Sequence, residues 1–396
     1  MHSRRPILRT SALLAAMLLL AGCAEIVPRY VARQIEHPAR PGQTLVQIEH
    51  QFARHDIGFR RGQVRLANGL NLVYWYSAPR AFDIQQHDQH GRHGASWSLK
   101  RTGMPLAPYL LPARLPGKGT VLLLPGWSMN ALLMSPWAIT FAQSGYHVVM
   151  VDLPDQGGSS LAPPGFGPAE ANDLRELVPQ LELAGAIRYP LYLFGVSYGA
   201  DVAVFAAQRL AQTPRGVIAL EPFSNVASAI RRAPDSGLFI PLWLAHLLLT
   251  RAEMDAAIDR ADRALGLDLY TLSPRPALLR AQACVLIVRG SRDRLIGARG
   301  LARMAHGLPR VQLFTARSYD HLSLLVAVQG FGAEFARWMG SVAPQPARSC
   351  PVFHHHRDYP PFLLRAHATP GTTWLTRYFD RQFNGALAVT QATAKG

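Results

Sequence analysis

The sequence predicts an α/β protein built on a doubly wound, mostly parallel sheet. Short, continuously apolar runs recur along the chain between segments of helical pattern, and most runs end in a turn rich in glycine or proline. Strands covered on both faces need such runs, and repeated strand–helix–strand units give parallel sheets. One run ends in Gly195-Val-Ser-Tyr-Gly199 and opens an Ala-rich helical segment, which is the pattern of a sharp strand-to-helix turn.

Amino-acid composition and net charge exclude some classes of function. The chain has 396 residues, 49% of them hydrophobic, which suffices for one large domain with insertions or for two domains. Its 41 Lys and Arg against 25 Asp and Glu give a formal charge of +16. No basic run, zinc pattern or aromatic RNA-binding motif accompanies this charge, so we expect no nucleic-acid partner. A solvated basic face and attraction to anionic lipid head groups are the two remaining interpretations.

Residues 1–22 have the pattern of a signal peptide. Three arginines precede an apolar segment, residues 12–20, which is short for a transmembrane helix. The segment closes in Leu20-Ala-Gly-Cys23, which resembles the lipobox of bacterial lipoprotein signal peptides. That resemblance implies cleavage before Cys23, acylation of its thiol and a lipidated tether over residues 23–57. Ala24 favours the outer membrane, facing the periplasm. An ordinary signal peptide that happens to contain a cysteine, or an uncleaved anchor, is the alternative.

The next elements are predicted in order. A β-hairpin is expected over residues 59–66 and 70–76, because Asn68-Gly69 is a strong hairpin signal. The polar stretch with His87, His90 and His93 is expected to be an exposed loop without metal, followed by a possible strand at 97–100. The core strands are then expected at 120–124, 147–153, 190–196, 216–220, 284–288 and 311–315, with helices at 131–143, 168–186, 200–211 and 322–339.

The helical segment 223–280 interrupts this alternation. It divides the predicted core into residues 58–222 and 281–340 and is expected to form a cap or lid. Its apolar stretch 237–249 is either a packed helix or a lid wall that receives an acyl chain or touches lipid. Residues 341–396 form a Pro-rich extension with an exposed His354-His-His356 and a possible docking helix at 374–383. Cys284 is expected to be buried, and its pairing with Cys350 stays open.

Ser197 is the candidate nucleophile of the turn. A serine hydroxyl is a weak nucleophile, so it needs a base within hydrogen-bond distance and a carboxylate that orients the base. Asp293 follows the strand 284–288, and His321 follows the strand 311–315. Parallel strands bring both side chains to the edge of the sheet where the turn stands. Glu221, at the end of the strand 216–220, is an alternative acid, and Asp320 beside the base is a weaker one.

These residues resemble the α/β-hydrolase fold superfamily, whose chain order is serine, acid, histidine. Arg289-Gly-Ser-Arg-Asp293 is similar to the acid turn of that family. The resemblance implies an oxyanion hole made by the backbone N–H groups of Tyr198 and Trp127. The chain departs from the family at Pro125-Gly126, where His-Gly is commoner, and at Asp155 and Gln156 in the turn that starts at Asp152.

The resulting hypothesis is a membrane-tethered serine hydrolase. It would cleave small-molecule or lipid carboxylic esters with an apolar acyl group, through an acyl-enzyme formed by Ser197, His321 and Asp293. No metal and no organic cofactor is expected. The same three residues would also serve a peptidase, a thioesterase or an acyltransferase, and a catalytically silent envelope lipoprotein is a further alternative.

Overall fold

The computed structural model describes residues 26–37, 58–80, 84–91, 94–101, 117–236, 249–344 and 349–355. For 84–91 and 94–101 it describes the backbone alone. The predicted signal peptide, Cys23, most of the apolar stretch 237–249 and the predicted helix at 374–383 lie outside these residues. None of the helices in the described part is long and apolar enough to cross a membrane.

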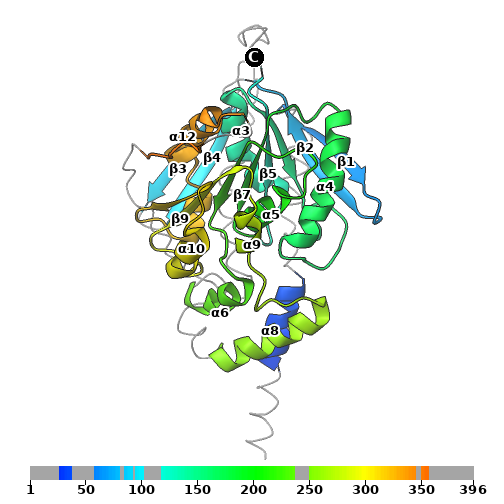
Figure 1. Cartoon of the computed structure of the whole chain (residues 1–396), viewed down its shortest axis with the longest axis vertical. Coiled ribbons are helices and arrows are strands. Elements are labelled where there is room, and N and C mark those ends of the chain that lie inside the picture. Colours follow the sequence, from blue (N-terminus) through cyan, green and yellow to red (C-terminus); the bar gives the residue numbers. More distant parts are fainter. Residues whose placement is uncertain are drawn as a thin grey trace, which may run out of the picture.

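An eight-stranded sheet forms the centre of the molecule, in the order β1-β2-β6-β5-β7-β8-β9-β10 (Figure 1). The first two strands pair antiparallel and β2 pairs antiparallel with β6, whereas all pairs from β6 to β10 are parallel. The predicted fold class is therefore confirmed. The strands are β1 (Arg60–Arg65), β2 (Asn71–Ser77), β5 (Thr120–Leu124), β6 (His147–Val151), β7 (Leu191–Val196), β8 (Gly216–Leu220), β9 (Cys284–Gly290) and β10 (Val311–Ala316).

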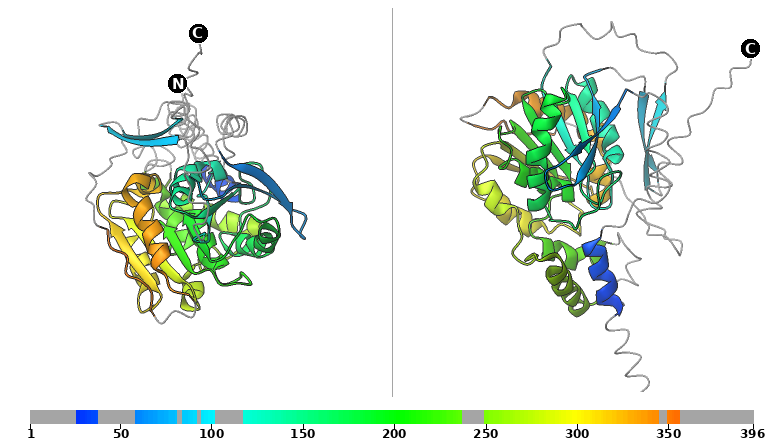
Figure 2. Two further views of the ribbon diagram at one scale, coloured as in Figure 1. Left: turned by 90° about the horizontal axis from the view of Figure 1, so that it is seen from above. Right: turned by 90° about the vertical axis from the view of Figure 1, so that its right-hand side faces the viewer.

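Helices cover both faces of the sheet (Figure 2). Successive residues of β5 alternate between the two sides: Val121 and Leu123 belong to one buried cluster, Leu122 and Leu124 to the other. Such a strand must be apolar at every position, which is why its sequence shows no alternation. The first cluster is completed by η2 (Ala131–Met134), α3 (Ser135–Gln143) and α12 (Val328–Ser341), the second by α4 (Pro168–Leu183), α5 (Tyr198–Ala206) and α10 (Ala298–Ala305).

Four elements differ from the sequence-based expectation. The polar stretch expected to be a loop contains strand β3 (Ile84–Gly91), so His87 and His90 lie in a strand, while His93 is outside the described residues. It pairs with β4 (Gly94–Arg101) in a separate two-stranded sheet. The single predicted closing helix is divided into α11 (His321–Leu325) and α12. Residues 26–36, expected to be a tether, form a helix.

The segment 223–280 contributes α6 (Val226–Ser236), α8 (Arg251–Leu265) and α9 (Arg275–Leu279). Helix α8 lies beside the helix of residues 26–36 at the end of the molecule shown lowest in Figure 1. Ala32 and Ile35 of that helix are buried in the same cluster as Ala257 and Ile258 of α8. The amino-terminal helix is thus packed onto the fold through apolar side chains.

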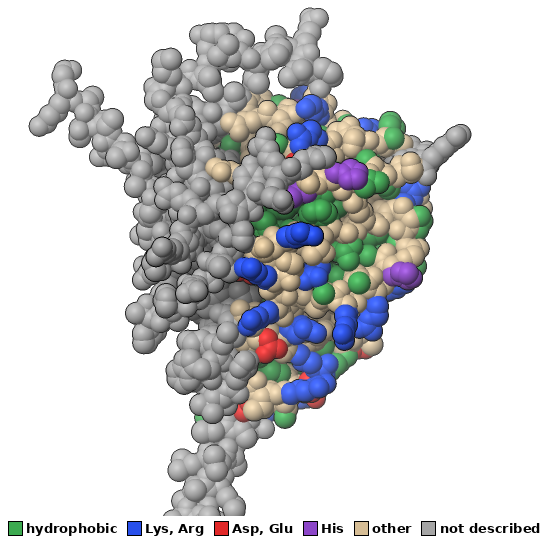
Figure 3. All heavy atoms as spheres, turned by 90° about the vertical axis from the view of Figure 1, so that its left-hand side faces the viewer, with side chains coloured by type: hydrophobic (Ala, Val, Ile, Leu, Met, Phe, Trp, Pro, Cys, Tyr) green, Lys and Arg blue, Asp and Glu red, His purple; other side chains and the backbone are tan. Residues whose placement is uncertain are grey.

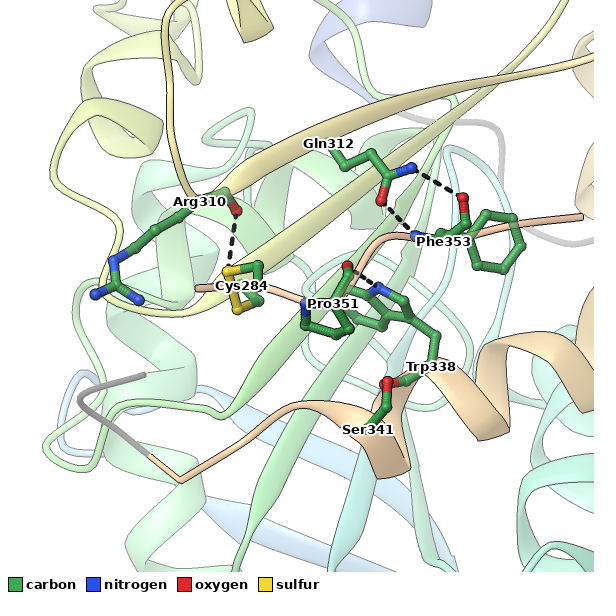
Figure 4. The surroundings of a disulfide bond; sticks show 8 residues. Cys284, Arg310, Gln312, Trp338, Ser341, Pro351 and Phe353 are labelled. Atoms are coloured by element: carbon green, nitrogen blue, oxygen red, sulfur yellow. Dashed lines mark hydrogen bonds between the residues drawn. A yellow bond between two sulfur atoms is a disulfide. The ribbon is translucent and has the colours of Figure 1, made fainter. Parts of the chain in front are cut away.

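A disulfide joins Cys284, at the start of β9, to Cys350 (Figure 4). The segment 349–355 docks across the sheet edge rather than forming an exposed tail. The Gln312 side chain exchanges two hydrogen bonds with the Phe353 backbone, and the Trp338 indole donates to the Pro351 carbonyl at 3.0 Å. Phe353 is buried, and His355 stacks on Phe331, whereas His354 is exposed as expected.

Removal of this disulfide is expected to lower the free energy of unfolding by about 4 kcal/mol. The bond closes a loop with a sequence separation of 66, and closing so long a loop restricts the unfolded chain strongly. Urea denaturation of the Cys284→Ala/Cys350→Ala variant measures the loss. Dithiothreitol should destabilise the wild-type protein by a similar amount and leave the variant unchanged. Equal urea midpoints for oxidised wild type and variant would contradict this expectation.

Candidate active site

Ser197 stands at the sharp turn between β7 and α5. Its backbone has φ 49° and ψ −117°, a region that side-chain-bearing residues rarely adopt, as expected for a nucleophile elbow. A Cβ at Gly195 would collide with the Gly199 carbonyl, and a Cβ at Gly199 with the Leu124 carbonyl. The Ser197 N–H donates to the Leu220 carbonyl at 2.7 Å, which anchors the turn to β8. Only glycines on both sides of the serine allow this close packing.

The structure brings Ser197, His321 and Asp293 together from three different strand ends. His321 Nε2 lies 3.1 Å from Ser197 Oγ, and His321 Nδ1 lies 2.7 Å from Asp293 Oδ2. All three residues are buried. In the tautomer with its proton on Nδ1, the imidazole donates to Asp293 and leaves Nε2 to accept from the serine. This is the arrangement that general-base activation of a serine requires.

Backbone hydrogen bonds hold the acid and the histidine in place. The Arg292 N–H donates to the Tyr319 carbonyl at 2.8 Å, which joins the turn after β9 to the loop before α11. Asp293 Oδ1 accepts from the Ile296 N–H at 2.8 Å, so one carboxylate oxygen is fixed and the other faces His321. Asp320 caps α11 by accepting from the Ser323 N–H at 2.9 Å. The weaker candidate for the acid thus has a structural role.

Asp293 is ionised in this environment. Burial alone would raise the pKa of its carboxyl, but the charge of His321 and hydrogen bonds from His321, Glu221 and the Ile296 backbone outweigh burial and lower the pKa. A carboxylate that stays charged keeps the imidazole in the required tautomer and stabilises the imidazolium that forms when the serine loses its proton.

Glu221, the alternative acid, lies behind Asp293 rather than against the base. Atoms of Glu221, Asp293 and His321 lie within 4.8 Å of one another, and Glu221 Oε1 accepts from the Gly290 N–H at 2.5 Å. Burial, followed by repulsion from the Asp293 charge and a hydrogen bond to Asp293, raises the pKa of the Glu221 carboxyl well above its usual value. Without a proton, Oε2 has no partner among the described residues. A neutral Glu221 that donates from Oε2 to Asp293 satisfies both groups.

The turn after β5 lies against the elbow. A Cβ on Gly126 would be 3.5 Å from Ser197 Cβ and 3.3 Å from the Val196 carbonyl oxygen, so the backbone of this turn passes directly beside the serine. Within the described part of the chain, neither the Trp127 nor the Tyr198 N–H donates to another residue. The turn that leads into Trp127 therefore lies beside Ser197, and neither predicted oxyanion donor is used by another described residue.

Two side chains that the sequence did not single out as site residues brace this turn. Gln156 Nε2 donates to the Gly126 carbonyl at 2.9 Å from a fully buried position. Asp152 accepts from the Ala131 N–H at 2.6 Å and from the Gly158 N–H at 3.1 Å. In the sequence, the turn that starts at Asp152 stands out only by its departures from the family pattern. The Gln156 side chain accounts for one of these departures, because it donates to the Gly126 carbonyl in the turn after β5, here called the oxyanion turn.

Tyr198 is anchored through its ring and its hydroxyl. The hydroxyl donates to Glu170, a buried residue in the first turn of α4 that also accepts from the Gly165 and Gly167 N–H groups at 2.6 and 2.8 Å. The Trp127 indole packs against the Tyr198 ring edge-on at 5.2 Å and stacks on Phe166 at 5.3 Å between centroids. An aromatic wall therefore borders the serine. The helix-start pattern around Glu170 is visible in the sequence, but its contact with Tyr198 is not.

The sheet, the elbow and the hydrogen-bonded histidine and aspartate define the α/β class of hydrolases. The sequence profile of the alpha/beta hydrolase family matches residues 121–336, more than half of the chain, and the chain belongs to that family. Comparison with curated protein sequences finds no match.

Several solved structures share the fold at low identity. The esterase Pf2001 of Pyrococcus furiosus is 15% identical, with a TM-score of 0.49, 78% of this chain and 97% of the esterase being covered. An esterase of Exiguobacterium antarcticum is 14% identical (TM-score 0.45; 70% and 99% covered). A thermophilic esterase of Thermogutta terrifontis is 16% identical (TM-score 0.45; 72% and 99% covered). At such identities the activities in these names belong to those proteins alone.

Proposed function

We propose that this hydrolase cleaves carboxylic esters through an acyl-enzyme on Ser197. The observation that carries the proposal is the unbroken chain of hydrogen bonds from Asp293 through His321 to Ser197 Oγ. His321 Nε2 takes the serine proton while Oγ attacks the ester carbonyl, and the imidazolium then protonates the leaving alkoxide. Water, activated by the same nitrogen, attacks the acyl-enzyme and releases the acid and the free serine.

The oxyanion of each tetrahedral intermediate is assigned to the backbone N–H groups of Trp127 and Tyr198. Tyr198 follows the serine in the chain, the turn that leads into Trp127 lies beside it, and neither N–H is used by another described residue. Donors fixed by the surrounding structure need no reorganisation when charge develops, so loss of one typically costs on the order of 10²- to 10³-fold in rate. Bracing by Gln156 and Glu170 supports this assignment, since it fixes the backbone that carries both donors.

An apolar acyl group is the favoured substrate feature. The half-buried Trp127 indole, backed by the buried Phe166 ring, forms an aromatic wall beside the elbow. A wall of this kind contributes transition-state binding in proportion to the apolar surface that the substrate buries on it.

Replacing Trp127 with alanine tests both the preference for an apolar acyl group and the place of this side chain in the acyl pocket. We expect Trp127→Ala to lower kcat/KM for nitrophenyl decanoate at least about tenfold and for nitrophenyl acetate less than about threefold, because alanine keeps the backbone N–H and removes only the wall. A chain-length series on the detergent-solubilised protein measures both. An equal loss on both esters would assign Trp127 to the turn instead of the acyl pocket. A wild-type protein that cleaves neither ester would refute the ester proposal.

Tethering to a membrane through Cys23, with the hydrolase facing the periplasm from the outer membrane, is part of the same proposal. The Leu20-Ala-Gly-Cys23 pattern supports acylation, and the Cys284–Cys350 disulfide agrees with an oxidising compartment. Metabolic labelling with palmitate should mark the wild-type protein and not Cys23→Ser. Equal labelling of both, or none of the wild type, would contradict the tether.

A further inference from the structure

A cavity with a volume of about 780 Å³ lies between α6, α9 and α10, and Ser197 is not among its lining residues. None of its lining residues belongs to the catalytic constellation or to the oxyanion turn. The cavity is basic. It is lined by Ser224, Asn225, Ser228, Arg232, Ser273, Arg275, Gly297, Arg299, Gly300, Arg303 and Met304.

Four arginines and no carboxylate line this cavity. The Arg275 guanidinium is engaged, since it donates to the Arg303 and Met304 carbonyls at the end of α10. Arg232 and Arg299 form no ion pair with any described residue, in contrast to Arg231, whose Nε lies 2.5 Å from Asp255. Lys and Arg side chains also gather on the lower half of the molecular face in Figure 3, with few acidic ones among them. Uncompensated positive charge therefore converges on the cavity.

Two glycines keep the cavity walls close to one another. A Cβ on Gly297 would lie 3.2 Å from Arg232 Cζ, so the guanidinium of α6 rests against the first residues of α10. A Cβ on Gly300 would collide with the Ser224 hydroxyl. The first turn of α10 has neither a side-chain cap nor an acidic residue. Its positive end adds to the field of the arginines.

We propose that this cavity binds a phosphate group carried by a larger molecule. Guanidinium forks match phosphate oxygens in pairs, and serine hydroxyls can donate to the remaining oxygens. Several uncompensated positive charges favour a dianion over a single carboxylate, and the cavity volume exceeds what one phosphate fills. The group belongs either to a soluble phosphate monoester or to a lipid whose head group is a phosphate monoester. The proposal does not depend on ester hydrolysis at Ser197.

The test compares two variants with equal loss of charge. Arg232→Gln/Arg299→Gln/Arg303→Gln removes the cavity arginines. Arg60→Gln/Arg65→Gln/Arg175→Gln removes three exposed arginines from β1 and α4, on the opposite part of the sheet. Isothermal titration of the full-length, detergent-solubilised proteins uses glycerol 3-phosphate and inorganic phosphate as soluble probes. Neutral detergent micelles doped with phosphatidic acid, against undoped micelles, provide the lipid probe.

We expect the wild-type protein and the control variant to bind at least one probe with similar Kd, and the cavity variant to bind it at least about tenfold more weakly. One charge-assisted hydrogen bond suffices for such a change. Added salt should weaken the binding of soluble probes. Binding of the soluble phosphates or of the doped micelles alone identifies the source of the group.

Equal Kd values for the two variants, or no binding of any probe by the wild type, would overturn the proposal. Circular dichroism of both variants checks that they are folded. The single Arg299→Gln variant, at an exposed position of α10, repeats the test if the triple variant unfolds. It should weaken binding in the same direction, and an unchanged Kd in a folded single variant would count against the site.

Discussion

The Ser197→Ala variant is expected to lose ester hydrolysis by on the order of 10⁴- to 10⁶-fold in kcat, with its fold intact. Ser197 Oγ is the atom that forms the bond to the acyl group. Without it, His321 Nε2 has no serine hydroxyl from which to accept a proton. What remains is the rate that binding and the oxyanion donors support without a nucleophile. The side chain is small and alanine leaves no large cavity, so circular dichroism and the urea midpoint should change little.

Ser144→Ala is the matched control for this variant. Ser144 lies at the end of α3, where its hydroxyl donates to the Thr140 carbonyl, far from the elbow in the chain. It should retain nearly full activity on nitrophenyl esters. Ester turnover that persists in Ser197→Ala at more than about a hundredth of the wild-type rate would place the nucleophile elsewhere.

The second large effect is a difference in kcat between variants of two buried carboxyl groups, Asp293 and Glu221. Asp293→Asn is expected to lower kcat by on the order of 10⁴-fold, because the amide favours the wrong imidazole tautomer. Glu221→Gln should stay within about tenfold of the wild type. Its amide can donate to Asp293 as the protonated carboxyl does, and its oxygen can still accept from the Gly290 N–H. Steady-state kinetics of both variants at pH 7 to 8 make the comparison. The reverse ranking would make Glu221 the acid.

The pH dependence of stability gives an independent measure of the Glu221 proton. The folded protein raises the pKa of this carboxyl above its usual value of 4.5. A raised pKa contributes stability that is fully present below the unfolded pKa and is lost as the pH rises through the folded pKa. The free energy of unfolding of Glu221→Gln, relative to the wild type, should therefore increase between pH 5 and pH 8. A difference that stays flat over this range would show that Glu221 is not protonated in the folded state.

The parallel core could be predicted because strands that are buried on both faces appear in the sequence as short, continuous apolar runs. Residues 121–124 and 148–151 alternate between two buried clusters and are all apolar, so the sequence shows these strands without any tertiary information. Ser197, Asp293 and His321 could be found for a related reason. They follow β7, β9 and β10, and parallel strands bring their carboxyl ends to one edge.

Other features depend on contacts between distant segments. The raised pKa of the Glu221 carboxyl follows from its burial beside Asp293, and no pattern around residue 221 indicates it. The break between α11 and α12 falls inside an apolar run that reads as one helix, and Asp320 starts a separate short helix that begins at His321. The basic cavity collects arginines from three helices of the cap and the core. The sequence shows the excess of positive charge, but it does not show which arginines the fold brings together.

The disulfide has a consequence for the order in which the protein is assembled. Cys284 lies in the strand that leads to Asp293, and its partner Cys350 is synthesised only after β10, α11 and α12 have been added to the chain. A chain interrupted before residue 350 can contain every residue of the catalytic constellation and still lack its covalent clamp. The covalent clamp can therefore form only on a chain that extends to residue 350, so a shorter chain would carry the catalytic residues without the stability that the disulfide adds.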